Sequence, residues 1–231
     1  MDAIRGGMAE LSGDDARHLT RVLRAEPGQR YEITDGQAAY LGEIAEARSQ
    51  RVVFRVVEPI ASAAPAVRIA LCAALVKFDR FEWTIEKATE LGVDAILPVD
   101  AARSEKGLIE ASRKRAVRWQ RIARESSQQA RRVGAPRILE AVSFDRALEQ
   151  AGHRFFLEEA TAPPLLHVLP AARVAGESVA LLVGPEGGWT DAERAQAAAA
   201  GWQPASLGPL VLRAETAAIA ALAVIANAWP R

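Results

Sequence analysis

The sequence predicts two domains, a small mainly-β unit followed by an α/β domain on a largely parallel sheet. Up to about residue 60, short strand-type runs follow one another with turn-forming residues between them, and beyond it strand-type and helix-type runs alternate. The connecting stretch over residues 61–66, ASAAPA, has no periodicity that could pack. We therefore expect domains over residues 1–62 and 63–231, since a chain of 231 residues can bury two cores.

The small domain is expected to open with an amphipathic helix over residues 14–24, because acidic first-turn residues precede an apolar stripe. That stripe is formed by Ala16, Leu19, Val22 and Leu23. Three strands are expected after it, over residues 30–34, 38–44 and 52–57. The pair Asp35-Gly36 provides a turn between the first two, so the unit is mainly β.

The pattern of the larger domain predicts alternating strands and helices. Strands are expected over residues 68–75, 95–99, 154–158 and 178–183. Helices are expected over residues 79–91, 108–129, 144–150, 190–200 and 213–228. This alternation predicts an α/β domain on a largely parallel sheet.

The composition excludes several classes of protein. Half of the residues are hydrophobic and a quarter are charged, which is typical of a globular chain. Cys72 is the only cysteine, and with three histidines it cannot assemble a zinc site, so we expect neither a disulfide nor a metal. The N-terminus lacks the features of a signal or transit sequence, and the apolar run over residues 217–226 is too short to cross a bilayer. We therefore expect a cytoplasmic protein.

The net charge is zero, but the charges are unevenly placed along the chain. Residues 103–132 carry ten Lys and Arg against three Asp and Glu. Such a basic stretch attracts phosphates, which favours a polyanion as partner. A solvated helix face explains the same charges without any partner.

The segment over residues 179–193, VALLVGPEGGWTDAE, is the most informative part of the chain. An apolar strand runs into a glycine-rich turn and then a helix start, which is where open α/β sheets bind ligands. Gly184, Gly187 and Gly188 let a ligand approach the backbone, and Thr190 with Glu193 has the spacing of a capping box. The turn lacks the lysine of a phosphate-binding loop and the spacing of a dinucleotide fold. It is either a ligand-binding loop or a purely structural turn.

A second Gly-Pro loop lies within residues 207–217, LGPLVLRAETA, directly before an alanine-rich helix. Both loops could converge at one edge of the sheet. Arg213 and Glu215 then stand near a helix start, where a carboxylate suits the positive end of the helix dipole. These two side chains either serve a site or cap the helix.

Taken together, these motifs resemble the 16S rRNA (uracil-N3)-methyltransferases of the SPOUT superfamily over nearly the whole chain. The matching segments follow in order, with a HxxRVLR-type stretch over residues 18–28 and a K-x-x-R-x-E-type stretch over residues 77–92. A short segment over residues 103–105 and a tryptophan-started helix over residues 119–129 come next. GPEGG and LGxxxLRxETA complete the set, and their order and spacing are the most specific of these signals.

The resemblance implies a PUA-like β-barrel that helps to hold RNA, followed by a methyltransferase domain. That domain would be a parallel sheet with a deep C-terminal trefoil knot, a rare exception to the rule that folds are unknotted. S-adenosylmethionine would bind in the knot, and 16S rRNA of the small ribosomal subunit would be the substrate. Members of this family act as homodimers, and the apolar helix over residues 217–226 is consistent either with burial at such an interface or with an internal core.

The resemblance also assigns residues to roles. The cofactor would contact Leu182, Val183, Gly184, Pro185, Glu186, Gly187, Gly188, Leu207, Gly208, Pro209, Leu210, Leu212 and Arg213. Candidates for RNA contact are Arg21, Arg24, Lys77, Arg80, Arg103, Gln128, Arg131 and Arg132. Arg213 is expected to stabilise negative charge on the uracil oxygens, and Glu186 or Glu215 to accept the N3 proton. No metal is implied.

Three departures from the family pattern stand out. The opening MDAIRGG is short, which predicts that the first strand of the small domain is missing or altered. Leu210 and Ala214 replace residues that are commonly polar, and residues 126–132 lack the usual glycine before the arginine. Two alternative functions stay open. One is another SPOUT RNA methyltransferase, such as a 2′-O-methyltransferase of tRNA or rRNA, and the other is a non-catalytic RNA-binding protein.

Overall fold

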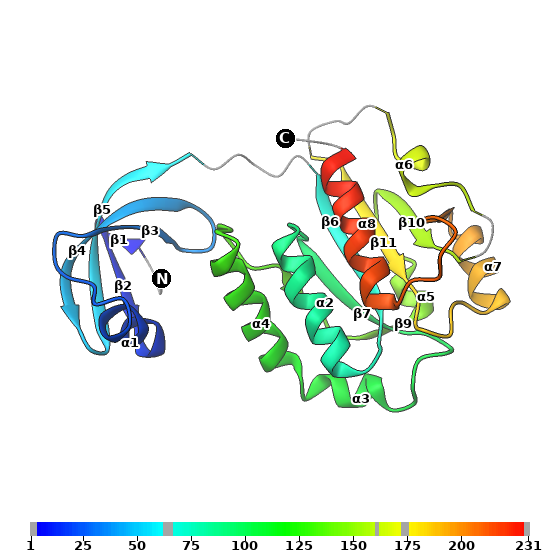
Figure 1. Cartoon of the computed structure of the whole chain (residues 1–231), viewed down its shortest axis with the longest axis horizontal. Helices are drawn as coiled ribbons and strands as arrows, with labels where there is room; N and C mark the ends of the chain where they lie inside the picture. The colour runs from blue at the N-terminus through cyan, green and yellow to red at the C-terminus, as the bar shows by residue number, and fades with distance from the viewer. Residues whose placement is uncertain (1–3, 62–66, 160–161, 172–175, 229–231) are drawn as a thin grey trace. The chain divides into compact units, whose positions relative to one another are not determined.

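The computed structural model describes residues 4–61, 67–159, 162–171 and 176–228 (Figure 1). The chain divides into two compact units, Met1–Ala64 and Pro65–Arg231. The predicted boundary between residues 62 and 63 lies outside the described residues.

The first unit is an antiparallel sheet of five strands in the order β1, β2, β5, β4, β3. The strands are β1 Ile4–Arg5, β2 Met8–Ser12, β3 Arg30–Thr34, β4 Ala39–Arg48 and β5 Arg51–Ile60. Helix α1, Gly13–Arg21, buries Ala16 in a core that includes Ile44 and Phe54. The three predicted strands are confirmed, and β4 and β5 are longer than expected because they pair with each other along almost their whole length.

One expectation for this unit is wrong, namely the end of its helix. Helix α1 ends at Arg21, because Arg24 adopts a positive φ of 51° and the N–H of Ala25 turns back to the oxygen of Leu19 at 3.1 Å. Val22 and Leu23 therefore leave the predicted apolar stripe and are 64% and 54% exposed.

The short opening of the chain does form a strand. Strand β1 is only two residues long and pairs with β2, with Ile4 opposite Ala9. Strand β2 in turn pairs with β5 from Met8 opposite Arg55 to Ser12 opposite Arg51. The first strand is therefore present in a two-residue form.

The second unit is built on a parallel sheet, which confirms the predicted α/β domain. Its main path runs β12, β10, β11, β6, β7, β8, and β9 also pairs with β7. The strands are β6 Arg68–Ala74, β7 Ala95–Asp100, β8 Arg137–Ile138, β9 Val142–Ser143, β10 His153–Leu157, β11 Ser178–Val183 and β12 Gln203–Ala205. The trefoil knot remains a prediction.

The helices of this unit are α2 Phe78–Glu90, α3 Leu108–Arg113, α4 Ala116–Gln129, α5 Phe144–Ala147, α6 Leu165–Val168, α7 Asp191–Ala199 and α8 Ala214–Ala228. The single helix expected over residues 108–129 is wrong. A tight turn divides it, in which the N–H of Arg115 donates to the oxygen of Ser112 at 2.8 Å. Within the described ranges, none of the helices is long and apolar enough to cross a membrane.

Both faces of the parallel sheet carry a core, because successive strand residues point to opposite sides. Leu71 and Leu181 pack with α2, α4 and α8 on the face that Figure 1 turns to the viewer. Their neighbours Cys72 and Leu182 pack with α5 and α7 on the other face. The sheet is therefore held rigidly between two layers, and its edges position the loops.

Strands β10 and β11 end side by side at the carboxyl edge of the sheet. Phe156 stands opposite Leu182 in the parallel register, so the chain leaves both strands at the same level. The loops after these strands consequently meet at one place, as expected for a ligand site in an open α/β sheet.

Candidate active site

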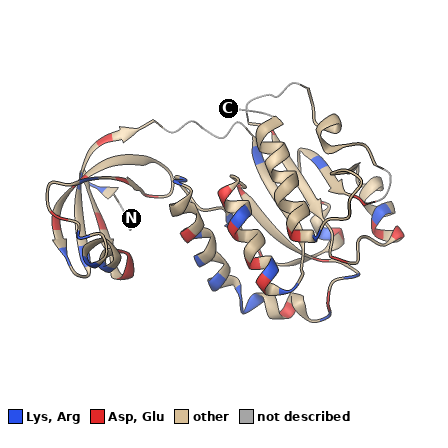
Figure 2. Ribbon diagram, in the orientation of Figure 1, with Lys and Arg blue, Asp and Glu red and all other residues tan. Residues whose placement is uncertain are grey.

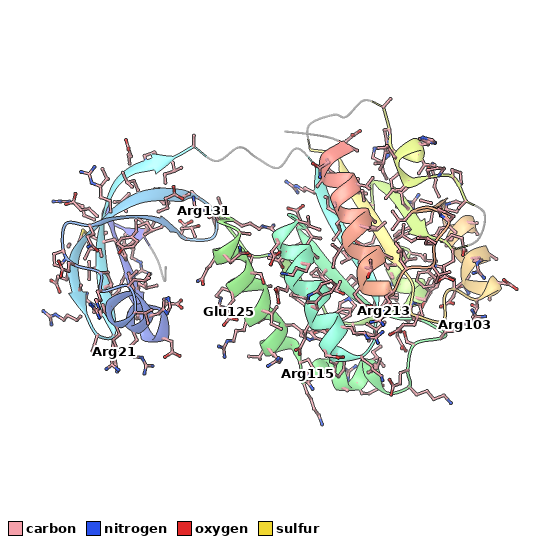
Figure 3. The ribbon with its side chains drawn as sticks, viewed as in Figure 1. Arg21, Arg103, Arg115, Glu125, Arg131 and Arg213 are labelled. Atoms are coloured by element: carbon pink, nitrogen blue, oxygen red, sulfur yellow. The ribbon has the colours of Figure 1, made fainter. Side chains whose placement is uncertain are left out.

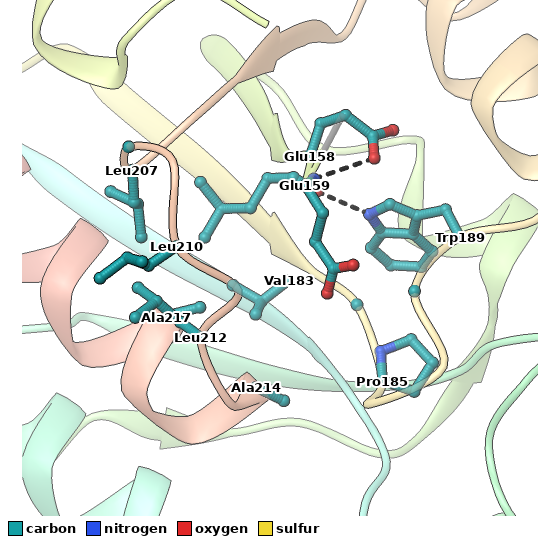
Figure 4. A pocket seen from close by; sticks show the side chains of 14 residues that line it. Glu158, Glu159, Val183, Pro185, Trp189, Leu207, Leu210, Leu212, Ala214 and Ala217 are labelled. Atoms are coloured by element: carbon teal, nitrogen blue, oxygen red, sulfur yellow. Dashed lines mark hydrogen bonds between the residues drawn. The ribbon is translucent and has the colours of Figure 1, made fainter. Parts of the chain in front are cut away.

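A cleft lies at the carboxyl ends of β10 and β11 (Figure 4). It is lined by Leu157, Glu158, Glu159, Val183, Gly184, Pro185, Gly188, Trp189, Leu207, Gly208, Leu210, Leu212, Ala214 and Ala217. Three segments supply this lining: the end of β10, the glycine-rich loop after β11, and the Gly-Pro loop that leads into α8. The two loops predicted from the sequence therefore do converge.

The glycine-rich loop is a tight turn closed over an indole ring. The N–H of Gly188 donates to the oxygen of Pro185 at 2.9 Å, and Gly188 has a φ of +67°, a conformation that glycine adopts without strain. Trp189 is buried, and a Cβ at Gly184 would lie 3.0 Å from its Cε2 atom. Gly184 thus leaves room for the indole ring of Trp189, which forms part of the cleft wall.

Arg103 and Glu193 hold the same loop from its outer side. Nη1 of Arg103 donates to the oxygens of Gly187 at 2.7 Å and Trp189 at 3.2 Å. The buried Glu193 completes the predicted capping box with Thr190, and its Oε1 accepts from the N–H of Ala102 at 2.8 Å. Capping and anchoring therefore both contribute to the conformation of this loop.

A cluster of charged side chains stands beside the cleft. Arg80 of α2 donates to Glu186 at 3.3 Å and lies 3.9 Å from Glu215. Glu215 is buried at the first turn of α8, and its Oε2 atom has no hydrogen-bond partner among the described residues. Glu186 follows the cleft residue Pro185 in the chain, so the cluster adjoins the cleft.

Arg213 occupies an exposed position directly before α8 (Figure 3). No ion pair is formed by its guanidinium with any described residue. A permanently charged and open guanidinium is suited to bind an incoming anionic group.

Most of the predicted cofactor residues line the cleft, and the exceptions have physical reasons. Leu182 points to the opposite face of the sheet and packs near Cys72, so its side chain is excluded from the cleft. Four further predicted residues belong to the two loops but are absent from the lining: Glu186, Gly187, Pro209 and Arg213.

Sequence reasoning missed the contribution of β10. The lining residues outside the predicted cofactor set are Leu157, Glu158, Glu159, Trp189, Ala214 and Ala217. The rule that was applied to β11 could have found the first three, because they lie at the end of a predicted parallel strand at the same edge. The signal was weak because no glycine marks the end of β10.

The candidates for RNA contact fall into two groups. Arg21, Arg24, Lys77, Gln128 and Arg131 are exposed. The other three form hydrogen bonds within the protein. Arg80 donates to Glu186, Arg103 donates to the oxygen of Gly187, and Nη1 of Arg132 donates to the oxygen of Thr89 at 2.8 Å. The second group is therefore expected to support the fold at least as much as it touches RNA.

The predicted basic stretch forms α3 and α4, where Figure 2 shows Lys and Arg along the helices. Glu82 pairs with Arg115 at 3.5 Å and with Arg118 at 2.8 Å, whereas Arg113 and Lys114 are exposed. Part of the positive charge is thus neutralised within the protein, and part is available to phosphates.

Comparison with known proteins identifies the class. Residues 63–226 match the model of the RNA methyltransferase domain family, and residues 11–57 match that of the RNA methyltransferase PUA domain. The fold and site are therefore those of an RNA methyltransferase with a PUA-like front domain.

The relatives define the family further. Ribosomal RNA small subunit methyltransferase E of Synechocystis is 33% identical, covering 93% of this chain and 71% of its own length. The Bacillus subtilis protein of the same name is 30% identical, covering 93% and 88%. A crystal structure of this methyltransferase from Neisseria gonorrhoeae, bound to S-adenosyl methionine, superposes with a TM-score of 0.87 at 28% identity, covering 99% and 96%. The chain belongs to the ribosomal RNA small subunit methyltransferase E family.

Proposed function

We propose that this protein transfers a methyl group from S-adenosylmethionine to N3 of a uridine in 16S rRNA of the small ribosomal subunit. The convergence of two glycine loops on one cleft, with Arg80 and two glutamates beside it, is the observation that supports this most directly. We further propose that the enzyme acts as a homodimer in the cytoplasm.

The cleft fits the proposed cofactor. Its lining combines apolar side chains with a few polar groups, as is usual for small-molecule sites. Leu157, Leu207 and Leu212 give it apolar walls, and the glycine loops expose backbone groups that can hydrogen-bond a purine and a ribose. When bound, S-adenosylmethionine supplies an electrophilic methyl group on a sulfonium.

The charged cluster accounts for the proton chemistry of the proposed reaction. Uracil N3 carries a proton that must leave before or as the new N–C bond forms, and a carboxylate is a suitable acceptor. The side chain of Glu186 is 43% exposed and that of Glu215 only 8%, so Glu186 is the glutamate that a uracil can reach. Glu215 then serves to hold Arg80 in place.

Arg213 is proposed to stabilise the negative charge that develops on the uracil oxygens. Arg213 directly precedes α8, two positions before Glu215, and its guanidinium forms no ion pair with the described residues. A preorganised cation near a developing oxyanion is worth about 3 kcal/mol or more in mutagenesis of other enzymes.

The proposed homodimer is supported by apolar surface around α8. Leu210 and Val211, just before this helix, are 78% and 76% exposed. Ala218, Leu222 and Ile225 face the protein's own core, but Ile219 and Val224 on the same helix are only partly buried. A second copy could cover these side chains.

The decisive experiment is methyl transfer from labelled S-adenosylmethionine to small ribosomal subunits that lack uracil-N3 methylation, followed by nucleoside mass spectrometry. We expect 3-methyluridine from the wild-type protein and at least a hundredfold loss of rate (about 2.7 kcal/mol) with Arg213→Ala. The surface variant Arg48→Ala, in the first unit, serves as a control. A ribose-methylated product would instead favour a 2′-O-methyltransferase, and a protein that binds no cofactor would be a non-catalytic RNA-binding protein.

A further inference from the structure

The cleft contains one carboxylate whose charge the described protein does not balance. Glu158 and Glu159 are the two acidic residues of the lining. Glu158 is bound by Arg194 through two hydrogen bonds of 2.5 and 3.1 Å, and this carboxylate raises the pKa of the Arg194 guanidinium. The side chain of Glu159 makes no hydrogen bond or ion pair with any described residue, and Figure 4 shows it pointing into the cleft.

The position of the Glu159 carboxylate is defined by its neighbours. Its backbone N–H donates to Oε1 of Glu158 at 3.0 Å, which ties the residue to the Arg194 pair. A Cβ at Gly188 would lie 4.0 Å from its Oε2 atom, so the carboxylate stands next to the glycine-rich loop. Glu186, the proposed proton acceptor, belongs to the same loop, two positions before Gly188.

We propose that Glu159 binds the sulfonium of S-adenosylmethionine and thereby distinguishes the methyl donor from the spent product. This inference rests on the proposed function. Glu159 is exposed, so its carboxylate can be reached by a ligand entering the cleft, and the donor brings a cation that this carboxylate attracts. In the transfer the S–CH₃ bond breaks with its electron pair left on sulfur, the N3–CH₃ bond forms, and the N3 proton passes to a carboxylate.

The change of charge at sulfur gives Glu159 a role in turnover. The donor is positively charged at sulfur, whereas the product S-adenosylhomocysteine is a neutral thioether there. Both ligands share the adenine, the ribose and the amino-acid group, so only the attraction to the sulfonium is lost after transfer. Glu159 therefore favours donor binding and product release at the same site.

Isothermal titration calorimetry of the full chain with each of the two ligands tests this inference. We expect Glu159→Gln to lower the affinity for S-adenosylmethionine about tenfold, the order of one partly screened charge pair, and the affinity for S-adenosylhomocysteine less than about threefold. Glu159→Asp should restore part of the preference for the donor. Glu140→Gln, an exposed glutamate outside the cleft, serves as the matched control.

The outcomes separate this inference from the proposed function. Equal losses for both ligands, or no loss for either, in a variant that unfolds like the wild type would overturn the role of Glu159. If Glu159→Gln shows no selective loss of S-adenosylmethionine affinity while the wild type still methylates subunits, the inference fails and the proposed function stands. If the wild type binds neither ligand, the proposed function fails and the inference fails with it.

Discussion

The indole of Trp189 and the backbone of Leu157 join two loops that are far apart in the sequence. Nε1 of Trp189 donates to the oxygen of Leu157 at 2.9 Å, and both groups are buried. This bond ties the glycine-rich loop after β11 to the end of β10 and so fixes the width of the cleft.

Replacing Trp189 by phenylalanine tests this tie. The variant keeps an aromatic ring but leaves the oxygen of Leu157 without its donor, so we expect the free energy of unfolding to fall by about 1 to 3 kcal/mol. The affinity for S-adenosylmethionine should fall as well. Urea unfolding measures the change in stability, and calorimetry measures the change in affinity. Trp202→Phe is a control. Nε1 of Trp202 donates to the oxygen of Leu148 at 3.2 Å, and neither residue lines the cleft.

Gly184 provides a second test of the cleft wall. A methyl group at this position would lie 3.0 Å from Cε2 of Trp189, which forces the ring or the loop to shift. We expect Gly184→Ala to weaken cofactor binding about tenfold or more, measured by calorimetry, because the cleft must change shape. Gly176→Ala tests whether any glycine replacement has this effect, since its φ of +88° strains a side chain but nothing lies within 4 Å of its Cβ position and it is absent from the lining of the cleft. Equal losses in both variants would contradict the prediction.

The sequence predicted the larger domain better than the smaller one, for a physical reason. Strand β11 and helix α7 can be predicted from their own residues. An apolar run, a glycine turn and the capping box of Thr190 with Glu193 mark them in the sequence. Strand β2 has no such signal, because its pairing with β5 depends on residues 39 to 47 positions away, from Ser12 opposite Arg51 to Met8 opposite Arg55. Elements of two residues, such as β8 and β9, have no detectable period at all.

The candidate site was predicted where backbone conformation leaves a mark on the sequence. Glycines marked both loops, but neither Glu159 nor Trp189 carries a local signal that it lines a cleft. Charge alone does not show which arginines also serve the fold, because Arg103 and Arg132, both predicted to contact RNA, donate to backbone oxygens of the protein. Which arginines are free depends on tertiary neighbours.

Arg131 should be a site where glycine is tolerated well. It follows α4 with a φ of +53°, a left-handed conformation that costs a side-chain-bearing residue about 1 kcal/mol. We expect Arg131→Gly to leave the free energy of unfolding unchanged or raise it by up to about 1 kcal/mol in urea denaturation. Arg132→Gly should instead lower it, because the bond to Thr89 is lost. Destabilisation by Arg131→Gly would contradict this assignment.

The basic face of α3 and α4 predicts the salt dependence of RNA binding. Arg113 and Lys114 are exposed, whereas Lys87 pairs with Glu86 at 2.7 Å and Glu90 at 2.8 Å. If Arg113 contacts phosphate, Arg113→Gln should reduce the slope of log K against log salt concentration by roughly one. Lys87→Gln should leave the slope unchanged. Fluorescence anisotropy with a small-subunit rRNA fragment measures both, and equal slopes for all three proteins would remove α3 from the interface.

Cys72 predicts how stability changes at alkaline pH. Burial raises the pKa of its thiol to about 12, against about 8.5 in an unfolded chain. Between these values the folded state keeps a proton that the unfolded state has lost, so stability falls as pH rises, by about 1.4 kcal/mol per pH unit. From pH 9 to 10.5 the wild type should therefore lose about 2 kcal/mol more than Cys72→Ala in urea unfolding. If the unfolding free energies of the wild type and Cys72→Ala fell in parallel with pH, the thiol would have the same pKa in the folded and unfolded states, and the prediction would be wrong. The native thiol should also resist iodoacetamide at pH 8, since it is buried and protonated there.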